Sequence, residues 1–215
     1  MKRTFSKSLK NSIKIVENAI YSLKKGKGIF LFDDYNRENE WDIVFAAENM
    51  VIEQMAFTIR YGSGIVCLCL TEEKVKQLNL PMMVKENNSK YQTPFTITIE
   101  AAKGVTTGVS AKDRITTIKT AINDLAKPSD LNKPGHVFPL KANPKGIFGR
   151  IGHTEAALDL VKLSGLKPAS VICELTNDDG TMASFNEVNK FSVLYDMPML
   201  KINNLIDYMN HTKIL

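Results

Sequence analysis

An acidic segment, Asp33 to Asp42, holds the residues whose types point most directly to chemistry. It carries five carboxylates and one arginine. Carboxylates this close together repel one another unless a cation lies among them. The apolar run at 28–32 just before the segment predicts a buried strand, which would deliver the acids to the edge of a sheet. The segment therefore predicts a cation site, with a solvated acidic turn as the alternative.

A glycine-rich turn at residues 149–155 has the chemistry to hold an anion. Its residues are Gly-Arg-Ile-Gly-His-Thr-Glu, and they lead into a predicted helix. Free backbone N–H groups and the positive end of a helix dipole favour phosphate, Arg150 adds charge, and Thr154 can cap the helix or bind the ligand. The turn lacks the spacing of the common nucleotide-binding motifs, so a small phosphorylated ligand fits it better. The alternative is an ordinary capped helix with an incidental arginine.

Three further positions carry groups suited to proton transfer or ligand binding. His136 lies between prolines in a segment that predicts an irregular loop, Glu174 follows a predicted strand, and Thr107 lies in a Thr-Thr-Gly turn. Each has an ordinary explanation as a loop histidine, a strand-end charge or a turn hydroxyl. Each residue type is equally compatible with a role as a general acid or base, or with a place in the lining of a pocket.

The composition suits one globular domain. The chain has 215 residues, 44% of them hydrophobic, which is enough apolar mass for a sizeable core. No apolar run approaches the roughly 18 residues that cross a bilayer, and no signal-like segment opens the chain, so we expect a cytoplasmic protein with no membrane partner. Three cysteines without metal-ligand spacing predict buried thiols in a reducing compartment.

The charge balance does not favour a nucleic-acid partner. The formal net charge is +5, but it comes from 23 lysines and 5 arginines dispersed along the chain. Arginine is the preferred residue for bidentate contacts to phosphates and guanine edges, and no dense basic block is present. The sequence therefore predicts no nucleic-acid partner.

Helical and strand-like segments alternate from end to end without a linker or repeat, which predicts one mixed α/β domain. Helices are predicted at 9–23, 52–61, 110–126, 155–163, 186–195 and 205–209, with a short helix after Thr71, and strands at 28–32, 64–70, 95–99, 169–173 and 199–202. The two prolines at 128 and 134 predict an irregular connection.

These segments together resemble one family, the 3,4-dihydroxy-2-butanone 4-phosphate (DHBP) synthases of riboflavin biosynthesis, and in particular its single-function bacterial members. The resemblance covers nearly the whole chain. Its motifs are residues 33–34 with 37–40, 62–68, 104–108, 134–139, 152–156, and 173–174 with 177–182. It implies an α+β fold, a three-layer α-β-α sandwich around a mixed twisted sheet of the YrdC/DHBP-synthase type. It also implies one synthase domain over residues 1–215, without the GTP cyclohydrolase II domain that some members carry.

The resemblance implies a carbon-carbon lyase. Its substrate would be D-ribulose 5-phosphate, and its products would be L-3,4-dihydroxy-2-butanone 4-phosphate and formate. The reaction would pass through a metal-stabilised enediolate, dehydration and skeletal rearrangement. The implied cofactor is Mg²⁺, with two ions per active site, and Mn²⁺ is an alternative because a histidine ligand suits it equally well. The implied assembly is a homodimer with active sites near the subunit interface.

The resemblance also implies roles for single residues. Glu38 and His153 would be metal ligands, and His136 and Glu174 would be the catalytic residues that transfer protons. The substrate-binding set would be Arg37, Glu38, Asp42, Arg150, Ile151, Gly152, His153, Thr154 and Glu174, with 150–154 holding the phosphate. Further residues expected to line the site are Asp33, Cys67, Thr107 and Glu155.

The chain departs from the family pattern within the acidic segment. Tyr35 and Asn36 stand where the family commonly has acids, and Trp41 stands where it has glycine. If that glycine needs a positive φ, Trp41 predicts a strained or shifted loop; the alternative is an apolar lid that excludes water.

Two other functions fit the residues. A different metal-dependent sugar-phosphate enzyme, such as an isomerase or aldolase, would use much the same acids, histidines and phosphate loop. A non-enzymatic RNA-binding module of the YrdC type would account for the basic pI of about 9.0, and it would have no need of Glu38.

Overall fold

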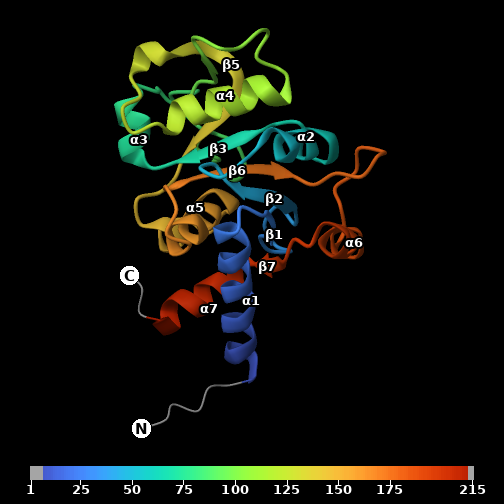
Figure 1. The fold of residues 1–215 in the computed structure, drawn as a ribbon. Coiled ribbons are helices and arrows are strands. Elements are labelled where there is room, and N and C mark those ends of the chain that lie inside the picture. Colours follow the sequence, from blue (N-terminus) through green and yellow to red (C-terminus); the bar gives the residue numbers. More distant parts are fainter. Residues whose placement is uncertain (1–6, 213–215) are drawn as a thin grey trace.

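A seven-stranded mixed sheet organises residues 7–212, the part of the chain that the computed structural model describes. The strand order is β4-β5-β3-β6-β2-β1-β7 (Figure 1). The strands are β1 (Ile29–Phe32), β2 (Trp41–Ala46), β3 (Cys67–Leu70), β4 (Ile99–Ala101), β5 (Leu131–Lys141), β6 (Ala169–Glu174) and β7 (Met199–Lys201). The β1/β7 and β3/β5 pairs are parallel, and the other neighbours are antiparallel.

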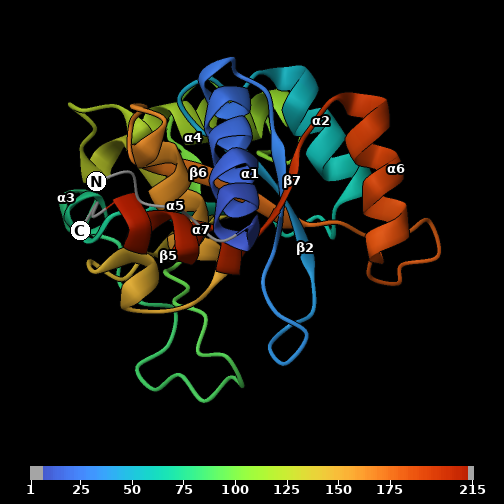
Figure 2. The ribbon, with the colours of Figure 1, turned by 90° about the horizontal axis from the view of Figure 1, so that it is seen from below.

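Helices cover both faces of this sheet. They are α1 (Lys7–Lys24), α2 (Ile52–Tyr61), α3 (Glu72–Gln77), α4 (Ala111–Ile122), α5 (His153–Leu163), α6 (Phe185–Tyr195) and α7 (Ile202–Thr212), with short 3-10 turns η1 (Pro128–Asp130) and η2 (Gly146–Phe148). Helices α1, α5 and α7 lie side by side on one face (Figures 1 and 2). None of the helices within 7–212 has both the length and the apolar character needed to cross a bilayer.

Side chains of the central strands point alternately to the two faces of the sheet, so the protein has two hydrophobic cores. In β1, Ile29 and Leu31 pack into the core shared with α1, α5 and α7, while Phe30 and Phe32 pack into the core shared with α2, α3, α4 and α6. Because successive side chains of a strand point to opposite faces, a fully apolar strand must be covered on both sides. The predicted three-layer α-β-α arrangement is therefore confirmed.

Most predicted elements are present, but three predictions about strands were wrong. The segment 128–134 is not simply an irregular connection, because β5 begins at Leu131 and includes Pro134 and His136. The pairing of β4 with β5 shifts register at Ile99/Glu100, and such an irregularity accommodates a proline that has no N–H to donate. The strand predicted at 95–99 begins only at Ile99. Strand β2 was not predicted at all.

Trp41 is a core residue. It is the first residue of β2, lies opposite Phe32 in the β1/β2 register, and is only 4% exposed. Its ring centroid is 4.9 Å from that of Phe32 and 6.1 Å from that of Phe185 on α6. Its φ is not among the positive values of the described residues. Both predictions for Trp41, a strained loop and an apolar lid, were therefore wrong.

Replacing Trp41 with alanine should lower the free energy of unfolding by about 3 kcal/mol, because the substitution leaves a cavity between β1 and α6. Urea denaturation followed by circular dichroism measures this change. The control is Leu125→Ala at a side chain that is 84% exposed, which should change stability by less than about 0.5 kcal/mol. Equal stability of Trp41→Ala and the native chain would contradict the core position.

Candidate active site

A pocket of about 270 Å³ lies where the acidic loop between β1 and β2 meets the start of α5. Strands β2, β3, β5 and β6 form its floor, and the segment at 91–95 closes one side. Figure 2 shows the acidic loop and the connection between α3 and β4 projecting from the same side of the molecule. The lining residues are Arg37, Glu38, Glu40, Asp42, Cys67, Tyr91, Thr93, Phe95, Leu140, Arg150, His153, Thr154, Ile172 and Glu174.

Asp33 organises the acidic loop from behind the pocket. Its buried carboxylate accepts hydrogen bonds from the backbone N–H groups of Glu38 (2.9 Å) and Glu40 (3.1 Å) and from Arg37 Nη1 (2.9 Å). Burial alone would raise the pKa of Asp33, but the charge of His153 and these donors hold it below its usual value. The Asp33 oxygens already accept three hydrogen bonds, so this side chain fixes the shape of the loop. Asp33 is not among the residues that line the pocket.

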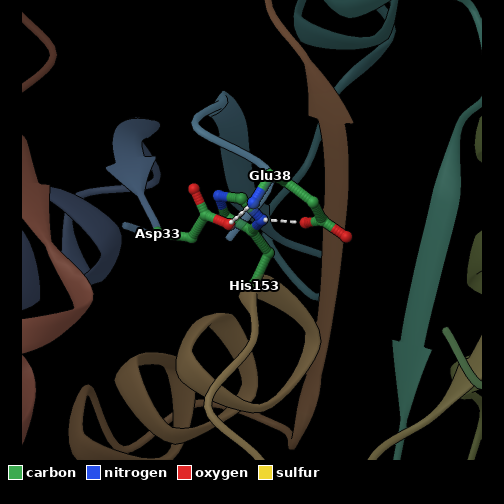
Figure 3. Close-up of side chains that lie close together, drawn as sticks. All are labelled: Asp33, Glu38 and His153. Carbon is green, nitrogen blue, oxygen red and sulfur yellow. Dashed lines mark hydrogen bonds and ion pairs between the residues drawn. The ribbon is translucent and has the colours of Figure 1, made fainter. Parts of the chain in front are cut away.

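His153 lies among three carboxylates. It is the first residue of α5 and is 5% exposed, with Nδ1 3.3 Å from Glu38 Oε2 and Nε2 3.7 Å from Asp42 Oδ1. Figure 3 shows its ring between Glu38 and Asp33. Burial would lower the pKa of the imidazole, but Asp42, Glu38 and Asp33 outweigh it and raise the pKa to about 9. The imidazole is therefore protonated near neutral pH in the metal-free protein.

Three other acids of the pocket have pKa values shifted in different directions because their surroundings differ. Burial raises the pKa of Asp42 well above its usual value, and burial and then Glu174 raise the pKa of Glu40. Burial also opposes ionisation of Glu38, but His153 and Arg37 outweigh it and lower its pKa. Glu38 is the carboxylate of this group whose ionised form the pocket favours most.

The donor atoms fit a hard divalent cation. Among the described residues, Asp42 Oδ1 and His153 Nε2 are two of three buried side-chain atoms that have no hydrogen-bond partner. Ligand atoms of Asp33, Glu38 and His153 also lie within 4.8 Å of one another. Carboxylate oxygens suit Mg²⁺, and an added imidazole nitrogen suits Mn²⁺ as well. Since Asp33 is occupied by its donors, Glu38 and His153, with Asp42 beside them, are the better ligand candidates.

One end of the pocket, beside the start of α5, holds Arg150, and Arg37 lies between this end and Glu38, to which its Nη1 also donates. Arg150 donates from Nη1 to Glu155 Oε2 (2.9 Å) and from Nη2 to the Tyr91 carbonyl (3.0 Å). The guanidinium groups of Arg37 and Arg150 converge on Gly152, the N-cap of α5, where a side chain would collide with Arg150. Two cations beside a helix N-terminus create a site for an anion.

The remaining residues of this turn occupy different positions. Thr154 lines the pocket, Ile151 is 56% exposed, and Glu155 is buried as the partner of Arg150.

Cys67 and Glu174 line the pocket as expected, and Glu174 lies opposite Asp42 in the β2/β6 register.

His136 and Thr107 do not line this pocket. His136 is exposed on β5, with Nδ1 3.2 Å from both carboxylate oxygens of Glu100. Glu100 also fills the space left by the missing side chain of Gly108, next to the exposed Thr107. The structure therefore gathers these residues into a second cluster, separate from the pocket of the same chain.

Sequence reasoning missed six residues of the pocket wall: Glu40, Tyr91, Thr93, Phe95, Leu140 and Ile172. Glu40 was counted in the acidic segment without a role. Tyr91 had no signal at all, yet its hydroxyl donates to the Arg37 carbonyl, and the Arg37 guanidinium lies 5.2 Å from its ring centroid. A lone tyrosine in a polar loop has no spacing to mark it, so only the tertiary contact identifies it.

Comparison with known proteins identifies the family. Residues 17–208 match the family model for 3,4-dihydroxy-2-butanone 4-phosphate synthase. The chain belongs to this family. The DHBP synthase of Wigglesworthia glossinidia brevipalpis is 67% identical over 195 residues, covering 91% of this chain and 92% of that protein. The DHBP synthase of Buchnera aphidicola subsp. Acyrthosiphon pisum (strain APS) is 62% identical over 211 residues, covering 98% of both.

Solved structures of the DHBP synthase family share the fold. One, a DHBP synthase in complex with two magnesium ions, is 35% identical to this chain with a TM-score of 0.89. The match covers 92% of this chain and 97% of that one. The family resemblance of the sequence is thus confirmed, and the chain is an enzyme of this family.

The charge on His153 predicts a pH-dependent stability of the metal-free protein. A pKa raised from 6.5 to about 9 contributes stability that is fully present below pH 6.5 and is lost as the pH rises through about 9. Urea denaturation in EDTA should therefore show a loss of up to about 3 kcal/mol between these pH values. His153→Gln should lack this component. Parallel pH curves for the native chain and the variant would contradict the raised pKa.

Proposed function

We propose that this protein converts D-ribulose 5-phosphate into L-3,4-dihydroxy-2-butanone 4-phosphate and formate, the reaction of its family in riboflavin biosynthesis. The observation that carries the proposal is the two-ended pocket, which sets Asp42 and His153 atoms without a hydrogen-bond partner near Glu38 and sets Arg150 at the start of α5, with Arg37 between them. A sugar phosphate has the same two-ended character, with hydroxyl and carbonyl oxygens at one end and a dianion at the other. Residues 1–215 would act as a single synthase domain.

The positive end would hold the phosphate. Arg150, Thr154 and the backbone of 151–153 at the start of α5 would bind its oxygens, and Arg37 would approach from the acidic loop. The contact of Arg150 with Glu155 fixes the guanidinium plane, so this arginine is already oriented before the ligand arrives. Arg37 and Tyr91 would close over the bound sugar.

The acidic end would hold the cofactor through Glu38 and His153. The magnesium-bound relative supports Mg²⁺ as the cofactor, and we extend its count of two ions to this chain, with Mn²⁺ as an alternative. When bound, the cation would act as a Lewis acid towards the sugar oxygens. Binding requires His153 to lose the proton it carries in the metal-free protein.

Proton transfer would fall to Glu174 at the end of β6. Its strand holds it on the pocket floor opposite Asp42, within reach of a sugar bound between the two ends. Asp42, directly opposite Glu174 in the β2/β6 register, would hydrogen-bond a sugar hydroxyl. Cys67 would supply an apolar wall beside the reacting carbons.

His136 would act from the neighbouring subunit of a homodimer. It is exposed and lies outside the pocket of its own chain, so a catalytic role requires another chain to bring it to a pocket. The cluster of His136, Glu100 and Thr107 would then complete the partner's active site. The reaction needs no nucleic acid or membrane, and we place the enzyme in the cytoplasm because its substrate is a water-soluble sugar phosphate.

Formate release tests the proposed reaction. The native protein with ribulose 5-phosphate and Mg²⁺ should release one formate per sugar, and EDTA should abolish the release. Glu38→Gln, His153→Ala and Glu174→Gln should each lower kcat by about 100-fold or more, because each removes a ligand or a proton-transfer group. Glu53→Gln, on the exposed start of α2, is the matched control and should retain native activity.

Two outcomes would separate the parts of this proposal. Native activity of Glu38→Gln would contradict the metal assignment. No formate from the folded, magnesium-loaded native protein would contradict the synthase reaction and would favour a different sugar-phosphate enzyme, which product analysis would identify.

Mixed dimers test the position of His136. Glu38→Gln and His136→Ala should each be inactive alone, yet co-expressed mixtures should regain about a quarter of native activity, because half of the random dimers hold one site with both native residues. Size-exclusion chromatography checks that the dimers form. Inactive mixtures would show that His136 does not act across subunits.

A further inference from the structure

The Gly62-Ser63-Gly64 turn between α2 and β3 is a family motif for which the proposed function names no role. It lies against the end of β6, where Ser63 makes two hydrogen bonds to one residue. The Ser63 backbone N–H donates to the Glu174 carbonyl (2.9 Å), and the Ser63 hydroxyl donates to Glu174 Oε2 (2.5 Å). Ser63 thus holds both the backbone and the side chain of Glu174.

The turn is itself held in place by groups other than Glu174. Gly62 N–H donates to the Thr58 carbonyl at the end of α2 (2.9 Å), and Arg114 Nη1 on α4 donates to the Gly64 carbonyl (3.2 Å). A side chain at Gly62 would lie 2.6 Å from Cys173 Sγ, so only glycine allows this approach to β6. These contacts therefore hold Ser63 in position without any contribution from the Glu174 side chain.

The Ser63 hydroxyl also has a defined direction. Its oxygen accepts the Ile65 backbone N–H (3.2 Å) and lies 3.5 Å from Cys173 Sγ, and Glu174 Oε2 at 2.5 Å is the nearest acceptor for its proton. A bond to Oε2 fixes the carboxylate plane and leaves Oε1 for the substrate.

We propose that Ser63 is a positioning residue for Glu174. Its hydroxyl holds the carboxylate on the pocket floor in the orientation that proton transfer requires. This inference rests on the proposed function, in which Glu174 takes a proton from the bound sugar. It extends that function by one residue that does not itself line the pocket.

A pair of variants of equal shape isolates the hydroxyl. Ser63→Thr keeps the donor and should retain most of the native kcat, whereas Ser63→Val should lower kcat about tenfold, the effect of one hydrogen bond to a charged group. The Michaelis constant for ribulose 5-phosphate should change less than about twofold in both, since the phosphate end is untouched. Ser63 is exposed, so the added methyl groups meet solvent.

The control for loss of a serine hydroxyl is Ser164→Ala. Its hydroxyl donates to the Leu160 carbonyl at the far end of α5, and its removal should leave kcat unchanged. The Glu174→Gln background gives a second test: there Ser63→Val should cause no further loss of the residual activity, because the group it orients is already gone. Thermal unfolding of every variant separates misfolding from mispositioning.

Three outcomes would overturn the inference. Equal kcat of Ser63→Val and Ser63→Thr would show that the hydroxyl does not matter. A tenfold loss that persists on the Glu174→Gln background would show that Ser63 acts through another group. Absence of formate from the native protein would overturn the proposed function, and the role of Ser63 with it. In the first two outcomes the native protein still releases formate. Failure of the Ser63 inference is therefore distinguishable from failure of the proposed function.

Discussion

The interaction on which the site depends is the packing of the buried His153 imidazole against the carboxylates of Glu38 and Asp42. Without positive charge among them, these acids would repel one another; Arg37 pairs with Glu38, and His153 lies near both Glu38 and Asp42. His153 carries that charge in the metal-free protein, as its pKa of about 9 indicates. In the proposed function the same atoms would accept a divalent ion once the proton leaves, so Glu38 and His153 would also hold the cofactor.

The sheet topology brings the functional groups together. Strand β6 lies between β3 and β2, which sets Glu174 opposite Asp42 on one side and Ile172 opposite Cys67 on the other. The acidic loop joins two neighbouring strands, and α5 begins at the same edge. Side chains carried by strands and a helix N-terminus keep their separations better than side chains carried by loops alone.

The departures from the family pattern fall on the outer side of this arrangement. Trp41 fills the core between β1 and α6, and Tyr35 packs its ring 5.0 Å from that of Phe32, with Lys201 over both rings. These contacts tie the acidic loop to the sheet through apolar surface. The side chains of the loop that line the pocket are Arg37, Glu38 and Glu40, and they take no part in these ring contacts. Tyr35 and Trp41 do not line the pocket.

Local sequence patterns by themselves determined the periodic helices, the apolar strands β1, β3 and β6, and, through the family motifs, most of the residues that line the pocket. These are short-range properties, since periodicity and caps depend on neighbours in the chain. Only the tertiary structure decided that β2 and β5 are strands, that His136 lies away from the pocket, and that Tyr91 and Ser63 hold Arg37 and Glu174. Each of these depends on groups remote in sequence: Glu38 and His153 are 115 residues apart, and Ser63 and Glu174 are 111. Strand pairing, burial and protonation are set by such partners, which no local pattern specifies.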